Sequence, residues 1–175
     1  RVEYIVEKGT DRSLVLKGVQ SKYSWVDYGS SYLPSDILAS LLLSQLNNKD
    51  TLQEKRKLIF KRYSKIFEKY IKFGLKILSI PNHITPNYHA FWVLFNDEVI
   101  RDNFLKMSLE RDISAYIGYI PLHSSKMGIK LGGLRYKLPK TDSIASRIVR
   151  LPFFLMSDEE LSYVENAYDE ILKKI

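Results

Sequence analysis

Residues 23–46 form a polar loop that leads directly into the most apolar helical pattern of the chain, YSWVDYGSSYLPSDILASLLLSQL. Gly29 can adopt backbone angles that other residues resist, and it therefore predicts a tight turn in this loop. Pro34 suits the first turn of a helix, where an amide proton would have no partner. A helix from Pro34 to about Asn47 places a row of aliphatic side chains on one face. That row consists of Ile37, Leu38, Leu41, Leu42 and Leu46.

Ser30 and Ser31 add two hydroxyls and two backbone amides at the glycine turn. Small polar groups at the entrance of a helix can hold an anion such as a phosphate. The same residue types also cap helices that bind no ligand, and a simple cap is the more common case. This stretch alone therefore leaves both a capped helix and a phosphate site open.

Composition narrows the class of protein. A chain of 175 residues with 45% apolar and 27% charged residues can form one globular domain with a sizeable core. It has no cysteine, which excludes disulfides and thiolate chemistry, and its three histidines are too scattered to predict a metal site. No apolar run is long enough for a membrane span and no signal peptide is visible, so we expect a cytoplasmic protein without a membrane partner.

The net charge of +7 raises the question of an acidic partner. Much of the excess falls on one predicted helix, as Lys55, Arg56, Lys57, Lys61, Arg62, Lys65, Lys69 and Lys72. A basic helix face is more often solvated than bound to nucleic acid, so we expect no nucleic-acid partner. A basic, nucleic-acid-binding α+β module is nevertheless the alternative from another functional class.

Downstream of the apolar helix, helices alternate with short β-favouring runs. An apolar stripe predicts a helix from about residue 52 to Gly74, and Asn96 or Asp97 caps another that runs to about residue 110. Strands are expected at 77–80, 89–95 and 113–120, a short helix at 141–149 and an extended stretch at 150–154. Ser157 and Glu160 form a capping box for the last helix. The pattern predicts an α+β fold, with His89 packed in its core.

The first residues resemble the last turns of an amphipathic helix, which Gly9 would cap. A domain seldom begins in the middle of a helix. We therefore expect this chain to be part of a longer polypeptide.

Several blocks of the chain, taken in order, resemble one known family. They are EKGTDRS at 7–13, W-x-D-x-G-S-S-Y-L-x-S-D at 25–36, YIPLH at 119–123, RLPFF at 150–154 and SDEEL at 157–161. In this order they resemble the DegT/DnrJ/EryC1/StrS sugar aminotransferases, which use pyridoxal 5'-phosphate (PLP). Within that family they are most similar to the dTDP-4-amino-4,6-dideoxygalactose transaminases.

The resemblance implies a fold. It predicts the α+β C-terminal small domain of an aspartate-aminotransferase-type (fold type I) PLP enzyme, in which helices pack on a short antiparallel sheet. Residues 1–32 would be the end of a large-domain helix plus an active-site loop, and residues 33–175 the small domain. Family members are homodimers whose active sites are built from both subunits.

The resemblance also implies a reaction, the transfer of an amino group from glutamate to the C4 keto group of a dTDP-4-keto-6-deoxyhexose in surface-glycan biosynthesis. A sugar-nucleotide 3-aminotransferase is the neighbouring alternative. In the family, the Schiff-base lysine and most cofactor contacts lie upstream of residue 7. This chain would then hold no catalytic residue and be inactive alone, and a purely structural or oligomerising segment is a further alternative.

Several residues lie at or beside family positions near the ligands. Ser31 stands where the family has an asparagine that reaches the cofactor phosphate of the neighbouring subunit, and Leu33 replaces a family arginine. His123 matches a histidine near the sugar nucleotide. Trp25 and Tyr32 would pack against the base or the sugar, or fill the domain interface. No metal ligand is implied.

Overall fold

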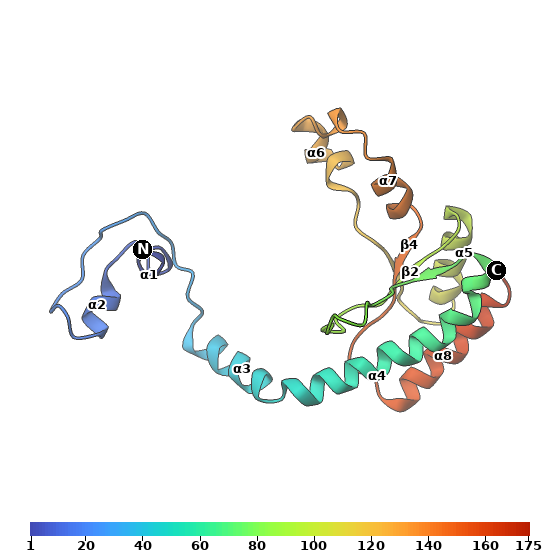
Figure 1. Cartoon of the computed structure of the whole chain (residues 1–175), viewed down its shortest axis with the longest axis horizontal. Coiled ribbons are helices and arrows are strands. Elements are labelled where there is room, and N and C mark those ends of the chain that lie inside the picture. Colours follow the sequence, from blue (N-terminus) through green and yellow to red (C-terminus); the bar gives the residue numbers. More distant parts are fainter. The chain divides into compact units, whose positions relative to one another are not determined.

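The computed structural model describes residues 1–175 as two compact units, residues 1–49 and 50–175 (Figure 1). The helices of the first unit are α1 (Val2–Val6), α2 (Arg12–Leu16) and α3 (Asp36–Asn47). The helices of the second unit are α4 (Lys49–Phe67), which begins at the boundary, α5 (Glu98–Leu109), α6 (Lys126–Lys130), α7 (Pro139–Ala145) and α8 (Asp158–Leu172). Short 3-10 turns lie at η1 (Glu68–Phe73), η2 (Leu122–Ser124) and η3 (Gly133–Arg135).

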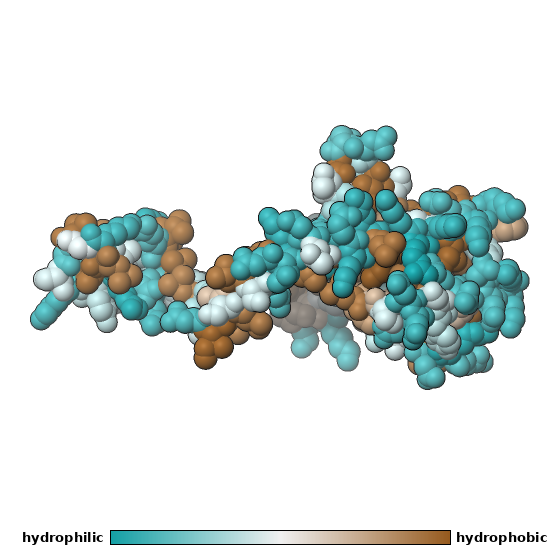
Figure 2. All heavy atoms as spheres, turned by 90° about the horizontal axis from the view of Figure 1, so that it is seen from below, coloured by the Kyte–Doolittle hydropathy of each residue, from teal (hydrophilic) through white to brown (hydrophobic).

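Helix α3 begins two residues later than the sequence predicts. Ser35 is its N-cap, and the Ser35 hydroxyl accepts a hydrogen bond from the amide of Leu38 at 3.4 Å. Pro34 therefore precedes the helix. The Ser35 side chain can accept a hydrogen bond from the first turn, whereas the proline side chain has no acceptor. The end at Asn47 is confirmed. None of its residues is buried, and its aliphatic row lies in the hydrophobic surface along α3 (Figure 2).

A four-stranded antiparallel sheet lies at the centre of the second unit. Its strands are β1 (Lys76–Ile77), β2 (Trp92–Leu94), β3 (Tyr116–Ile117) and β4 (Ile148–Arg150), in the order β1-β2-β4-β3. Strands β1, β2 and β3 are each shorter than the β-favouring run that predicts them, whereas β4 overlaps the extended stretch expected at 150–154 only at Arg150. The helix expected at 141–149 ends at Ala145, because residues 148–150 pair with both β2 and β3. That pairing is non-local, so a short sequence window does not contain it.

Helices α4, α5 and α8 cover one face of this sheet (Figure 1). Val93 and Val149 pair across β2 and β4 on the covered face, and both are fully buried. Between them and the helices lies a cluster of aromatic rings with centroids about 5 to 6 Å apart, most of them tilted or edge-on. The cluster comprises Phe60, Tyr63 and Phe67 of α4, Phe91 beside β2, Phe104 of α5 and Tyr168 of α8.

The helix ends follow their predicted signals closely. The Asp97 carboxylate accepts the amide of Ile100, and Ser157 and Glu160 form the expected capping box. Gly74 ends η1 with a φ of 94°, a left-handed angle that favours glycine. His89 is a correction, because it is exposed, lies outside β2 and contacts the side chain of Asn87 at 2.7 Å.

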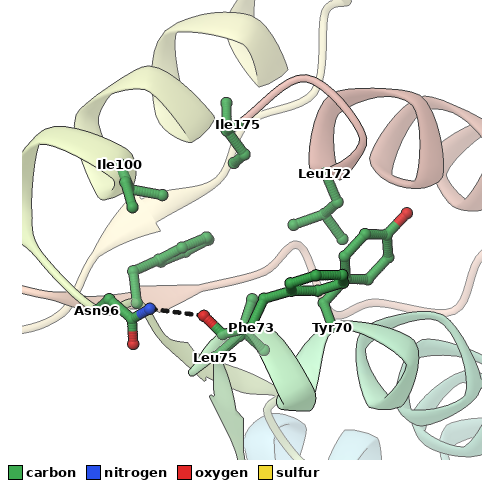
Figure 3. A pocket seen from close by; sticks show the side chains of 8 residues that line it. Tyr70, Phe73, Leu75, Asn96, Ile100, Leu172 and Ile175 are labelled. Carbon is green, nitrogen blue, oxygen red and sulfur yellow. Dashed lines mark hydrogen bonds between the residues drawn. The ribbon is translucent and has the colours of Figure 1, made fainter.

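A cavity of about 70 Å³ lies between η1, α5 and the end of α8 (Figure 3). Leu75, Ile100 and Leu172 are among the aliphatic side chains that line it. The amide of Asn96 turns toward η1 and donates to the carbonyl oxygen of Phe73 at 2.7 Å. The Tyr70 hydroxyl is also bonded, to the carbonyl oxygen of Asp169 at 3.3 Å, so this cavity is a packing gap rather than a site for chemistry.

Two buried tyrosines differ in their hydroxyls, and this difference yields a stability test. The Tyr63 hydroxyl donates to the carbonyl of Pro152 at 2.9 Å, whereas the buried Tyr168 hydroxyl has no partner. Burial raises the pKa of both hydroxyls, so both stay protonated. We expect Tyr168→Phe to raise the free energy of unfolding by about 1 kcal/mol and Tyr63→Phe to lower it by about 1 kcal/mol. Urea unfolding followed by circular dichroism measures both, and equal losses would mean that Tyr168 has a bonded partner.

Candidate functional site

The segment from Trp25 to Tyr32, here called the aromatic loop, is held against residues 5–10 by backbone hydrogen bonds. The amides of Val26 and Asp27 donate to the carbonyl of Gly9 at 2.8 and 3.0 Å. Near the other end of the loop, the amide of Ser30 donates to the carbonyl of Ile5 at 3.0 Å. The carbonyl of Ser30 accepts from the amide of Lys8 at 3.2 Å. The loop is therefore fixed at both ends, although almost none of it is buried.

Two glycines allow this contact. Gly9 has a φ of 75°, and a Cβ atom placed on it would lie 1.8 Å from the carbonyl oxygen of Asp27. A Cβ on Gly29 would lie 2.2 Å from the backbone nitrogen of Gly9. Gly29 does not adopt a positive φ, so the expectation that it supplies unusual backbone angles is wrong. It is required because two backbones approach closely.

One carboxylate supports the middle of the loop. Asp27 accepts from the Arg1 guanidinium and from the backbone amide of Tyr28, each at 2.8 Å. These bonds, the one from Arg1 foremost, hold the pKa of Asp27 below its ordinary value. The loop is thus fixed by an ionised aspartate at neutral pH.

Ser31 presents donors that the loop itself does not use. It pairs with Glu7 in an antiparallel bridge, and the neighbouring hydrogen bonds are made by Ser30 and Tyr32. The amide of Ser31 therefore points away from residues 5–10, and its hydroxyl makes no hydrogen bond. An exposed hydroxyl and a free amide on a fixed loop are the kind of donors that a phosphate requires. Ser31 fits the phosphate of PLP in this respect.

The rings of Trp25 and Tyr32 flank Ser31 in the sequence and are 74% and 66% exposed. Tyr28, which the sequence analysis did not single out, is 85% exposed on the same loop. Exposed aromatic rings of this number on one short loop are typical of surfaces that bind a partner or a ligand. Trp25, Ser31 and Tyr32 thus lie on one exposed loop of the first unit.

His123 lies in the second unit, within η2. Its Nε2 is 3.1 Å from a carboxylate oxygen of Asp142 in α7, and its side chain is only 11% exposed. The contact links η2 to α7, so the histidine has a structural partner. Nδ1 makes no hydrogen bond within the protein.

A pocket of about 310 Å³ lies between β3, α5 and α7, with Asp142 and Ser124 in its wall. Arg101, a buried residue that the sequence did not indicate, also lines this pocket. The Arg101 guanidinium donates to Glu98 at 2.9 Å, and its Nε lies 2.8 Å from a carboxylate oxygen of Asp102 without hydrogen-bond geometry. The E-x-x-R spacing of Glu98 and Arg101 is typical of an ion pair on a helix, but no local signal in the sequence indicated that Arg101 is buried.

Other site classes are not supported. No group of three or more histidine, cysteine, aspartate or glutamate side chains could hold a metal ion. None of the helices combines the length and the hydropathy that crossing a bilayer requires.

The fold of both units occurs in aminotransferases of known structure. An aminotransferase TlmJ from Streptoalloteichus hindustanus superposes with a TM-score of 0.82 at 21% identity, over 99% of this chain and 44% of its own. Spr1654 from Streptococcus pneumoniae, provisionally assigned as a sugar aminotransferase and solved in its PLP-form, superposes with a TM-score of 0.79 at 22% identity, over 98% and 42%. At these identities the likeness defines an aminotransferase fold and nothing finer.

The sequence comparison then defines the family. Residues 7–168 match the sequence model of the DegT/DnrJ/EryC1/StrS aminotransferase family, and the chain belongs to this family. An uncharacterized protein, MJ1066 from Methanocaldococcus jannaschii, is 26% identical over 90% of this chain and 43% of its own. The chain thus spans less than half of the length of the proteins that it matches.

The close glycine contact generates a prediction. In Gly29→Ala the new Cβ would collide with the backbone of Gly9, so the aromatic loop should separate from residues 5–10. We expect the amides of Ser30 and Tyr32 to exchange hydrogen at least about tenfold faster, equivalent to about 1.4 kcal/mol of lost local stability. Amide exchange followed by NMR measures this effect. Ser31→Ala is the matched control, because the bridge uses only the backbone around it, and equal acceleration in both variants would contradict the steric explanation.

Proposed function

We propose that this chain is part of a PLP-dependent sugar aminotransferase that transfers an amino group from glutamate to the C4 keto group of a dTDP-4-keto-6-deoxyhexose. The observation that carries the proposal is the family match over residues 7–168, which includes both the aromatic loop and His123. The product would enter surface-glycan biosynthesis in the cytoplasm. A sugar-nucleotide 3-aminotransferase differs only in the carbon that is aminated.

The proposed role of the chain is to hold ligands rather than to carry out the chemistry. When bound, PLP supplies the electron sink for amino-group transfer. The hydroxyl and amide of Ser31 donate to the cofactor phosphate, in a homodimer in which that cofactor belongs to the neighbouring subunit. Residues 1–32 are proposed as the active-site loop and residues 33–175 as the small domain.

The sugar nucleotide is assigned to Trp25, Tyr32 and His123. The two exposed rings of the loop offer flat apolar surfaces for a base or a sugar. In His123, Nε2 lies 3.1 Å from a carboxylate oxygen of Asp142, so Nδ1 is the ring nitrogen left to contact a sugar hydroxyl. The contact with Asp142 keeps the imidazole ring at a fixed orientation, which is what selection among sugar hydroxyl positions requires.

The nucleic-acid alternative loses part of its support. Cations of this basic segment are occupied within the protein, with Arg62 of α4 bound to Glu165 and Lys69 of η1 bound to Asp169. The aromatic rings of α4 are buried in the core and cannot stack on bases.

Absorbance spectroscopy tests the activity. The complete protein encoded by the parent gene, mixed with PLP, should show a yellow band that bleaches when L-glutamate is added, because the cofactor takes up the amino group. We place the Schiff-base lysine upstream of residue 7, so the 175-residue chain should show neither the band nor activity. A folded complete protein without the band would overturn the proposal.

Ser31 is tested in the same complete protein. Ser31→Ala removes one hydrogen bond to a charged phosphate, so the PLP concentration at half saturation should rise about tenfold, equivalent to about 1.4 kcal/mol. Equilibrium dialysis of the cofactor gives this constant. Ser30→Ala, whose hydroxyl makes no hydrogen bond in the structure, is the control and should leave it within about twofold. An unchanged constant for Ser31→Ala would remove this residue from the cofactor site.

A further inference from the structure

A groove of about 420 Å³ lies on the second unit between α4 and residues 80–88, the loop that joins β1 to β2. It shares no residue with the aromatic loop or with the pocket beside His123. Its volume falls within the roughly 300 to 1,000 Å³ of small-molecule sites. The groove is therefore large enough for a compact organic ligand.

The inner surface of the groove is apolar and firmly held. Phe60 is 7% exposed, and its ring packs edge-on against Tyr88 at a centroid distance of 5.3 Å. Tyr88 has a φ of 45°, which is uncommon for a residue other than glycine. The ring contact offsets the cost of that angle, and it fixes the end of the loop against α4. Ile80 and Ile84 extend the apolar wall along the loop.

Two lysines stand at the groove without partners. Lys61 and Lys65 are four residues apart on α4, so they lie on the same helix face about 6 Å apart at Cβ. Neither makes an ion pair or a side-chain hydrogen bond, in contrast to Lys57 and Arg62 on the same helix. Of the charged residues that line the groove, only Glu68 is acidic.

Two neutral polar groups complete the lining. The hydroxyl of Ser64 lies one residue before Lys65, and the side-chain amide of Asn82 comes from the facing loop. Neither side chain makes a hydrogen bond within the protein. The groove thus combines an apolar wall, unused donors and an excess of positive charge.

We propose that this groove binds an organic phosphate monoester with a compact apolar or aromatic body. The two ammonium groups complement a phosphate dianion, because both can reach its oxygens from one helix face. The body of the ligand packs against Tyr88 and Ile84, and the donors of Ser64 and Asn82 bind remaining oxygens. Glu68 disfavours a longer polyanion that would run along α4. The site is separate from the proposed aminotransferase chemistry and does not depend on it.

The test uses the 175-residue chain and 1-naphthyl phosphate as the probe. NMR titration should shift the backbone amides of residues 61–65 and 80–88 in a saturable way. Inorganic phosphate and 1-naphthalenemethanol each lack half of the proposed recognition, so each should bind at least about tenfold more weakly. An affinity for inorganic phosphate equal to that for the probe would contradict the apolar part of the site.

Charge-matched variants locate the site. The double variant Lys61→Gln, Lys65→Gln should raise the dissociation constant of the probe about tenfold or more. Lys55→Gln, Lys174→Gln lowers the net charge equally but lies outside the groove, so it should change that constant by less than about twofold. Equal losses in both variants, shifts confined to other residues, or tighter binding of a DNA oligonucleotide at the same amides would overturn the proposal.

Discussion

Aromatic packing between α4, α8 and the sheet is the interaction on which the second unit depends. Its strands are only two or three residues long, and pairs this short supply too few hydrogen bonds to be stable alone. Rings from three helices fill the space above Val93 and Val149, where burial of large apolar surfaces supplies the main driving force. The sheet is therefore held in place by its packing against the helices. The loops that carry His123 and the lysine-lined groove are in turn attached to those elements.

The first unit is ordered by a different kind of interaction. It has almost no buried apolar residues, and the aromatic loop is held by backbone hydrogen bonds, an ionised aspartate and a close glycine contact. Such contacts fix a backbone path without covering the side chains that lie on it. This division explains how Trp25 and Tyr32 can be both well positioned and exposed. A loop that must present rings and donors to a ligand needs this combination.

Local signals in the sequence predicted much of the fold. The caps at Asp97 and Ser157 and the stop at Gly74 act within one helical turn, so a short window contains them. The position of β4 could not be predicted in this way, because its partners β2 and β3 both lie earlier in the chain, outside any short window around residues 148–150. The true role of Gly29 and the burial of Arg101 depend on segments that meet only in three dimensions. The candidate ligand residues came from family blocks, and their roles stay predictions.

The exposed aliphatic row of α3 has a consequence for calorimetry. The heat capacity of unfolding rises with the apolar surface that becomes newly hydrated. Residues 36–47 are already hydrated on all sides in the folded chain, so their unfolding adds little to this quantity. The heat-capacity change of the whole chain should therefore resemble that of a protein the size of its second unit. If a partner covered α3, unfolding of the complex would expose that apolar surface, and the heat-capacity change of unfolding would increase.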